Sequence, residues 1–323
     1  MTPDPLLSAL ASHTAAMAHA ETRAPAHSAA HPCPCPRPTE AVTLADRPDG
    51  TVVRHAGTVA KAHAPDTDPA ELALRVAVAA RLTGVLLPPL DTPDAPARLA
   101  GRLVTHWPYG APVDPDDPDA APWEDAAALL ARLHRTPAPF PLPPMRGPAK
   151  AAQAVARLRA RAPHHPGTAP VLSAWAALPA WARGEAAPPG AGTLCHGDLH
   201  LGQLVRHPAP GGPWLLIDVD DLGVGTPAWD LARPAAWYAC GLLPPEAWQR
   251  FLSAYRAAGG PAVPADGDPW PALDVPARAL TAQTAARSVT KAVAEGRPLD
   301  DVEEEFVGAC ARMASVPLAA SGS

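Results

Sequence analysis

The chain has 323 residues, of which 47% are hydrophobic, so it can form one large domain or two lobes with a cleft between them. This composition excludes global disorder, because enough apolar surface is available to form a core. The formal net charge of −6 and the lack of a basic stripe argue against a nucleic-acid-binding protein.

Residues 1–40 are rich in Ala, His and Pro, and we interpret them as an N-terminal arm that is mobile or loosely packed. Residues 6–17 could form one helix in this arm, whereas the proline-rich run that follows must be extended. The arm also carries residue types that bind zinc, but their spacing matches no standard zinc pattern. These residues are His19, His27, His31, Cys33 and Cys35.

Residues 41–105 have the pattern of a small sheet with one helix. Three short apolar segments at 41–44, 51–54 and 58–63 are separated by turns and predict an antiparallel meander. A helix is expected over 68–82, where Asp68 can cap the first turn and Glu71 follows three residues later. Further strands are expected at 85–87 and 99–105.

Residues 106–120 break this pattern with an acidic, proline-rich loop, which we interpret as a hinge and linker. Residues 121–323 are then mainly helical, apart from a strand pair around 193–219. The sequence therefore predicts an α+β protein with an N-terminal antiparallel sheet and a larger helical C-terminal lobe. The helices are expected at 123–135, 149–161, 171–181, 245–258, 276–295 and 301–314.

The five cysteines are an odd number and are scattered along the chain, so they do not form the pattern of a disulfide framework. No run of about 18 apolar residues predicts a membrane span, and the N-terminus does not have the pattern of a secretion signal. We therefore expect a cytoplasmic protein that does not contact membranes, either a monomer or a homodimer.

The residue types needed for phosphoryl transfer occur in two neighbouring segments, 194–205 and 214–221, which we expect to form a β-hairpin. Phosphoryl transfer needs a carboxylate to orient the attacking hydroxyl, oxygen ligands for Mg²⁺ and a cation on the phosphates. Asp198, Gln203 and Asp218 supply the first two, and Lys61 can supply the third. Taken alone, Asp198 could equally be a turn residue.

The same segments resemble the aminoglycoside phosphotransferase-like family of small-molecule kinases, which includes the choline kinases. Residues 196–203 follow the family's His-Gly-Asp-x-His-x-x-Asn motif, and residues 217–218 with 225–232 follow its second signature. Residues 129–134 and 251–256 are similar to two of its helices. The resemblance covers roughly residues 50 to 260 and implies a protein-kinase-like fold of two lobes.

The resemblance also implies a role for each motif residue. Asp198 would be the catalytic base or the carboxylate that orients the hydroxyl, with His200 beside it shaping the loop or contacting substrate. Gln203 would replace the usual Asn as a magnesium ligand, as in the similar maltokinases, and Asp218 would be the second ligand. His196 and Asp230 would support the catalytic loop without touching substrate.

Nucleotide binding is expected in the N-terminal lobe. Lys61 lies on the third strand, where kinases place the lysine that binds the α- and β-phosphates, with Glu71 as its partner. The alternative is an exposed strand lysine and a glutamate at a helix start. Residues 105–109, including Thr105 and Trp107, would contact adenine through their backbone, and Arg54 is a further candidate for phosphate contact. A phosphate loop is poorly supported, because Gly50 is the only glycine between the first two strands.

We therefore predict a kinase that uses ATP and Mg²⁺ to phosphorylate a hydroxyl of an amino sugar, a sugar, an amino alcohol or a specialised metabolite. Asp220, Asp221 and the acidic run at 300–305 could favour an amine-bearing acceptor, although this run could equally be the start of a helix. The first alternative is a nucleotide-binding pseudokinase with little turnover. A Ser/Thr protein kinase ranks last, because no Ala-Pro-Glu segment follows Asp218.

Overall fold

The chain folds into two compact units that are defined by their internal contacts. The computed structural model describes residues 5–22, 41–47, 49–90, 96–190, 192–313, 315, 316 and 318. The first unit comprises Met1–Val113 with Leu204–Val219, and the second comprises Asp114–Gln203 with Asp220–Ser323. The hairpin at 204–219 therefore belongs to the N-terminal unit, whereas the sequence analysis assigned it to the C-terminal lobe.

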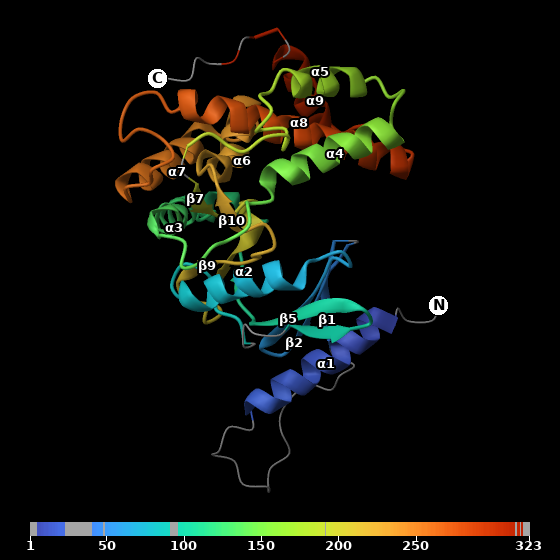
Figure 1. The fold of residues 1–323 in the computed structure, drawn as a ribbon, viewed down its shortest axis with the longest axis vertical. Helices are drawn as coiled ribbons and strands as arrows, with labels where there is room; N and C mark the ends of the chain where they lie inside the picture. The colour runs from blue at the N-terminus through green and yellow to red at the C-terminus, as the bar shows by residue number, and fades with distance from the viewer. Residues whose placement is uncertain are drawn as a thin grey trace, which may run out of the picture. The chain divides into compact units, whose positions relative to one another are not determined.

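The first unit is built on an antiparallel five-stranded sheet in the order β1-β2-β3-β5-β4 (Figure 1). The predicted meander is present, because β1 pairs with β2 and β2 pairs with β3. Side chains alternate between the two faces of a strand, so Ala60 and Ala62 lie in the core and Lys61 points to the opposite face. The strands are Val42–Arg47, Gly50–His55, Thr58–His63, Ala97–Leu99 and Arg102–Pro108, numbered β1 to β5.

Helix α1, Pro5–Thr22, lies along this sheet and packs against β2 and β3 (Figure 1). Leu10 is fully buried in a cluster with Val53, Ala60, Ala62 and Val104. The expectation of a loosely packed arm is therefore wrong for this helix, since burying its apolar face is what completes the core of the first unit. The remainder of the predicted arm, residues 23–40, lies outside the described residues.

Helix α2, Pro69–Arg81, begins where the sequence predicted. The Asp68 carboxylate accepts hydrogen bonds from the backbone N–H groups of Ala70 and Glu71, at 2.8 and 2.9 Å. Such a cap satisfies N–H groups that have no partner within the helix.

Two predicted strands differ from the observed ones. The strand expected at 99–105 is split by a turn at Ala100–Gly101 into β4 and β5, and β5 continues to Pro108. The expected hinge residues His106 and Trp107 are therefore strand residues paired with β3. Residues 85–87 form only isolated bridges, one of them between Leu86 and Leu216. The first unit also contains a three-stranded sheet formed by Ala111–Pro112, Leu204–Arg206 and Trp214–Leu216, which are β6, β8 and β9.

The second unit is mainly helical, as predicted, and α8 is its central element, in contact with α4, α5, α6 and α9. Helix α3 has both predicted ends. The strand pair of the second unit joins β7, Thr193–Cys195, to β10, Gly223–Gly225. The helices are Trp123–Arg135, Gly147–Arg161, Thr168–Ala176, Ala228–Ala239, Pro245–Ala257, Trp270–Glu295 and Asp301–Met313, which are α3 to α9, and a short 3-10 turn lies at Pro118–Ala120.

Helix α6 is not predicted from the sequence, and α8 begins six residues before its predicted start at Pro276. Both helices contain an internal proline, Pro234 in α6 and Pro276 in α8, which normally interrupts a helical pattern. Both prolines are buried, so tertiary packing outweighs the local cost of the missing N–H. Among the described residues, no helix is both long and apolar enough to cross a membrane.

The packing of α1 leads to a test of stability. We expect Leu10→Ala to lower the free energy of unfolding by about 2–5 kcal/mol, because it leaves a cavity beneath α1. The matched variant Leu44→Ala, at a side chain in β1 that is 49% exposed, should cost less than about 1 kcal/mol. Urea denaturation followed by circular dichroism measures both changes, and equal costs for the two variants would mean that α1 is only loosely attached.

Candidate active site

Asp198 lies in the loop that follows β7, and cations bind both of its carboxylate oxygens. Lys150 Nζ is 2.9 Å from Oδ2, and Arg233 Nη2 is 2.5 Å from Oδ1. Burial opposes ionisation of this carboxyl, but the charges of Lys150, Arg233 and His200 outweigh it and hold the pKa of Asp198 well below its usual value. Asp198 is therefore a carboxylate at neutral pH, able to accept a hydrogen bond from a hydroxyl but weakly basic.

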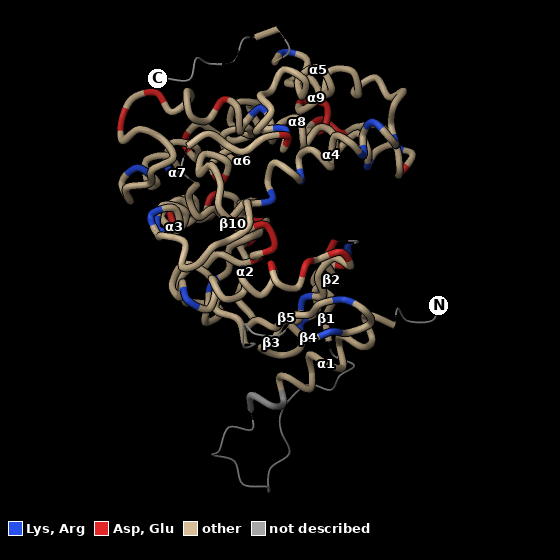
Figure 2. The backbone as a smooth tube through the Cα atoms, in the orientation of Figure 1, with Lys and Arg blue, Asp and Glu red and all other residues tan. Residues whose placement is uncertain are grey.

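Lys150 also binds a second carboxylate, with Nζ 2.5 Å from Asp221 Oδ2. Burial would lower the pKa of Lys150, but the charges of Asp221 and Asp198 raise it above its usual value, so the ammonium stays protonated. Arg146 lies close to the same pair, with Nε 3.9 Å from Asp221 Oδ1. Basic residues occur in both the first and the last turn of α4, which begins at Gly147 (Figure 2).

The sequence analysis missed Lys150 and Arg233 as site residues. No local motif contains either one, and both reach Asp198 only because α4 and α6 fold beside its loop. A signal for Lys150 was present in the composition, since the chain has 26 Lys and Arg residues of which only three are lysine.

Asp230 fixes the backbone of the loop that carries Asp198. Its Oδ2 accepts a hydrogen bond from the His196 N–H at 2.6 Å, and its Oδ1 accepts one from the Gly197 N–H at 2.7 Å. Gly197 has φ +88°, and a Cβ there would lie 2.4 Å from the backbone oxygen of Asp221. Only glycine fits this position without a shift of the backbone, so the loop can pass close to residue 221.

A buried hydrogen-bond chain continues from Asp230 to Tyr255. His134 Nε2 lies 3.0 Å from Asp230 Oδ2, and His134 Nδ1 lies 2.7 Å from the Tyr255 hydroxyl. That hydroxyl also accepts the Ala262 N–H at 3.0 Å. A His134 tautomer with its hydrogen on Nε2 would donate to Asp230 and accept from Tyr255, so both of its ring nitrogens would have partners in this hydrogen-bond network.

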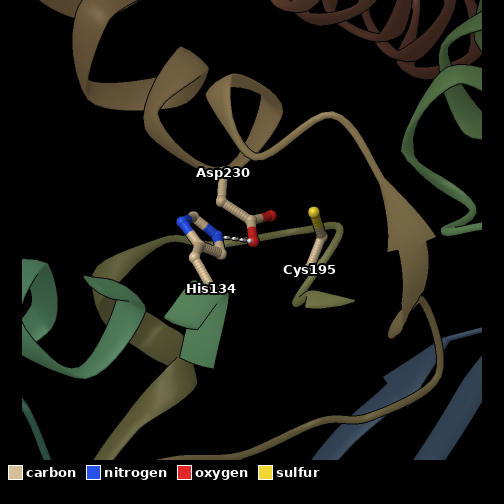
Figure 3. Close-up of side chains that lie close together, drawn as sticks. All are labelled: His134, Cys195 and Asp230. Carbon is tan, nitrogen blue, oxygen red and sulfur yellow. Dashed lines mark hydrogen bonds and ion pairs between the residues drawn. The ribbon is translucent and has the colours of Figure 1, made fainter. Parts of the chain in front are cut away.

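The side chains of His134, Cys195 and Asp230 lie within 4.8 Å of one another, close enough to suggest a metal site (Figure 3). Both ring nitrogens of His134 are already hydrogen-bonded, and Asp230 accepts two backbone N–H groups. Burial, together with the nearby Asp230, raises the pKa of the Cys195 thiol well above its usual value, and its Sγ donates to Thr193 O. A metal would require the thiolate, so this group fits a hydrogen-bond network and does not fit a metal centre.

His200 and Gln203 shape the rest of the loop. His200 is exposed, and its Nδ1 accepts the Gly202 N–H at 3.1 Å, which is the loop-shaping role considered for it. Gln203 is buried in the short 3-10 turn Leu201–Gln203, and its backbone N–H donates to His200 O at 2.8 Å.

In the first unit the structure joins Lys61 to Asp218, with Nζ 2.6 Å from Oδ1. Asp218 has φ +65°, a left-handed conformation that costs energy outside glycine and often occurs at functional sites. Glu71, the expected partner of Lys61, instead pairs with Arg75 at 2.9 Å within α2. Lys61 and Asp218, two residues predicted separately for the site, therefore form an ion pair that was not predicted. The pairing of Lys61 with Glu71 stays a prediction.

The side chains of Thr105 and Trp107 are used in internal contacts. Thr105 Oγ1 lies 2.8 Å from His63 Nε2 and accepts the Trp107 indole N–H at 2.9 Å. Trp107 also packs against the cluster of Leu87, Val205 and Leu215. Any contact of these two residues with adenine would therefore come from the backbone, as the sequence analysis expected.

Two further phosphate candidates differ in their surroundings. The Arg54 guanidinium stacks on the Tyr109 ring, 3.4 Å from its centroid, and donates to Ala56 O, so it is held away from a phosphate role. Gly50 lies over Lys61, since a Cβ at Gly50 would be 3.6 Å from Lys61 Cε.

The acidic run at 300–305 forms the start of α9. Asp300 Oδ1 accepts the Glu303 N–H, and Glu303 in turn accepts the Asp300 N–H, which is a reciprocal helix cap. Hydrogen bonds from Arg297 lower the pKa of Glu303 to about 2. These contacts favour the helix-start interpretation over a role in acceptor binding.

The sequence matches the profile of a known protein family. The profile of the Phosphotransferase enzyme family, APH, matches residues 45–273. No curated protein matches the sequence.

Three solved structures with a similar fold are described as small-molecule kinases or phosphotransferases. A choline/ethanolamine kinase family protein from Mesorhizobium loti is 17% identical, with TM-score 0.51 and coverage of 93% of this chain and 95% of that one. The choline kinase LicA from Streptococcus pneumoniae is 13% identical, with TM-score 0.54 and coverage of 85% and 93%. Aminoglycoside phosphotransferase APH(4)-Ia, bound to AMP-PNP and hygromycin B, is 13% identical, with TM-score 0.58 and coverage of 86% and 95%.

These likenesses confirm the predicted α+β, kinase-like fold class. They do not show the specific similarity to maltokinases that the His200-Leu201-Gly202-Gln203 segment suggested.

Removing the Tyr255 hydroxyl oxygen tests how much the buried hydrogen bonds between Tyr255 and the loop that carries Asp198 contribute to stability. We expect Tyr255→Phe to lower the free energy of unfolding by about 1–3 kcal/mol, because His134 and Ala262 each lose a buried partner. Tyr238→Phe, at a partly exposed tyrosine in α6, is the matched control and should change it by less than about 0.5 kcal/mol. If chemical denaturation gave the same value for both variants, the Tyr255 hydroxyl would contribute nothing to this chain.

Proposed function

Because the chain belongs to the phosphotransferase enzyme family, we propose that it transfers the γ-phosphoryl group of ATP to a hydroxyl of a small molecule. One observation carries most weight: the Asp198 carboxylate is held ionised between two cations, in a loop whose backbone Asp230 fixes. A carboxylate in this state can orient an acceptor hydroxyl, which is the main task of the protein in this reaction.

The role of each residue follows from its charge and position. The acceptor hydroxyl donates its hydrogen bond to Asp198, which aims the oxygen at the phosphorus. Because Asp198 is a weak base, the hydroxyl proton leaves late, when the new oxygen–phosphorus bond is largely formed. Lys61 would bind the phosphate oxygens of the nucleotide.

The residues also fit a magnesium ion. Asp218 offers a carboxylate and Gln203 a carboxamide oxygen, the hard oxygen ligands that Mg²⁺ prefers. When bound, Mg²⁺ would neutralise charge on the phosphates. Gln is one methylene longer than the Asn of the family motif, so Gln203 could reach this ion from a slightly different backbone position.

The acceptor is proposed only as a class: an amino sugar, a sugar, an amino alcohol or a specialised metabolite. Proteins of similar fold are described in complex with hygromycin B and with spectinomycin, two different small molecules. Asp221 is engaged by Lys150 and Arg146, so it no longer argues for an amine-bearing acceptor. The cytoplasmic location, the monomeric or homodimeric state and the lack of nucleic-acid and membrane partners remain proposals.

The second candidate is a nucleotide-binding pseudokinase. Two features favour it: Gln203 in place of Asn, and Gly50, the first residue of β2, as the single glycine of the segment from β1 to β2. Such a protein would bind ATP but release no ADP with any acceptor.

The central test is Asp198→Asn, assayed by ADP release with MgATP and a panel of amino sugars, sugars and amino alcohols. We expect kcat to fall by about 10²- to 10⁴-fold, because the amide cannot accept the proton, with little change in ATP affinity. Asp125→Asn, at an exposed aspartate in the first turn of α3, should retain full activity. Equal activity of the two variants would remove Asp198 from the reaction. Nucleotide binding by the wild-type protein without any turnover would favour the pseudokinase.

The proposed phosphate contact of Lys61 makes a separate prediction. Lys61→Met should weaken MgATP binding by about 10- to 100-fold, the loss expected for one charge-assisted hydrogen bond. Isothermal titration calorimetry measures this affinity, and Lys291→Met, at an exposed lysine of α8, serves as the control. An unchanged dissociation constant would show that Lys61 does not touch the nucleotide.

A further inference from the structure

Lysine is unusually rare in this chain, which uses arginine for nearly all of its basic positions. Of its three lysines, Lys61 and Lys150 form ion pairs with aspartates of the predicted site, and Lys291 is exposed on α8. Arginine is favoured wherever a flat, two-pronged contact is enough, whereas lysine provides a compact charge with three rotatable donors. The use of lysine at position 150 therefore indicates a need for a point charge there.

Lys150 lies next to Asp198, where a point charge can act on the reacting groups. Its Nζ lies 2.9 Å from Asp198 Oδ2, and its side chain is 21% exposed, so a bound molecule can reach it. A hydroxyl oriented by Asp198 lies about 3 Å from that carboxylate, and the phosphorus it attacks lies about 3 Å further. An ammonium at this place lies beside the carboxylate that would orient the attacking hydroxyl.

Asp221 holds the Lys150 ammonium in place, so that its position does not depend on Asp198 alone. It binds Lys150 at 2.5 Å from a side chain that is only 7% exposed, and it is itself approached by Arg146. Lys150 therefore has a fixed anchor on one side and the reacting centre on the other. Negative charge that develops on a phosphoryl group needs such a preformed cation, because no reorganisation is then required during the reaction.

We propose that Lys150 is a catalytic cation that contacts the transferring phosphoryl group, with Asp221 as its positioning residue. This inference rests on the proposed phosphotransferase function and adds a residue that no motif of the sequence indicated. The competing view is that Lys150 is a purely structural ion pair that ties α4 to the loops at 198 and 221.

The two views predict different binding of a mimic of the transferring group. The probe is MgADP with and without aluminium fluoride, a compact anion that replaces the phosphoryl group, and the dissociation constant of each mixture is measured by calorimetry. In the wild-type protein and in Lys291→Met, aluminium fluoride should tighten MgADP binding. Lys150→Met should lose at least tenfold of this gain, Lys150→Arg should recover part of it, and MgADP alone should bind equally to all four.

Asp221→Asn separates catalysis from stability. It removes the anchor but keeps the ammonium, so we expect its melting temperature to fall as much as that of Lys150→Met, while it loses a smaller part of the aluminium fluoride gain than Lys150→Met does. In an assay with a turned-over acceptor, Lys150→Met should lower kcat by about 10²- to 10³-fold with little change in the KM for ATP.

The pH profile of kcat tests a premise that both views share, namely that Lys150 lowers the pKa of Asp198. The charged groups that face Asp198 are Lys150, Arg233 and His200, with Asp221 on the far side of Lys150. Removing Lys150 leaves burial less opposed, so the pKa of Asp198 rises and the acid limb of kcat moves to higher pH. If Lys150 were only part of a structural ion pair, Lys150→Met would still shift this limb but would leave the aluminium fluoride gain unchanged.

The outcomes can be distinguished. An equal aluminium fluoride gain in Lys150→Met and Lys291→Met overturns the inference, and so does the lack of any gain in a wild-type protein that binds MgADP. If the wild-type protein binds neither MgADP nor MgATP, the proposed function itself fails and the inference fails with it.

Discussion

The Asp230 carboxylate is one of the most extensively hydrogen-bonded among the described residues, and the geometry of the loop that carries Asp198 depends on it. It is 1% exposed and joins α6 to two consecutive backbone N–H groups of the loop and to His134 of α3. A buried carboxylate is costly unless every oxygen is bonded, so these contacts restrict the loop to one conformation. Gly197 allows that conformation, and Asp198 follows directly in the sequence.

Charge balance is the second constraint around this loop. Two carboxylates, Asp198 and Asp221, are placed among Lys150, Arg233 and Arg146, so neither stands as an isolated negative charge. This arrangement lowers the pKa of Asp198, and in the reaction that we propose the cation beside it would stabilise the negative charge that develops during phosphoryl transfer. In such a site, orientation and electrostatic stabilisation matter more than proton abstraction.

Much of the fold could be predicted because local patterns agree with the tertiary structure. The meander of β1 to β3, the Asp68 cap of α2 and both ends of α3 follow from strand alternation, capping chemistry and helical periodicity. Helix α6 could not be predicted, because Pro234 interrupts its pattern and burial overrides that signal. The motif indicated Asp198 and Asp230, but Lys150 and Arg233 come from helices distant in sequence. Their contacts arise only from tertiary packing.

The scarcity of lysine has a practical consequence for handling the protein. An amine-selective ester can modify only three side chains of the lysine type, and two of these ammonium groups are held against carboxylates. Lys291, exposed on α8, is thus the lysine that reacts first. A dye or surface tether would therefore be attached at Lys291 and at the α-amino group of the chain, without the broad mixture of conjugates that lysine-rich proteins give.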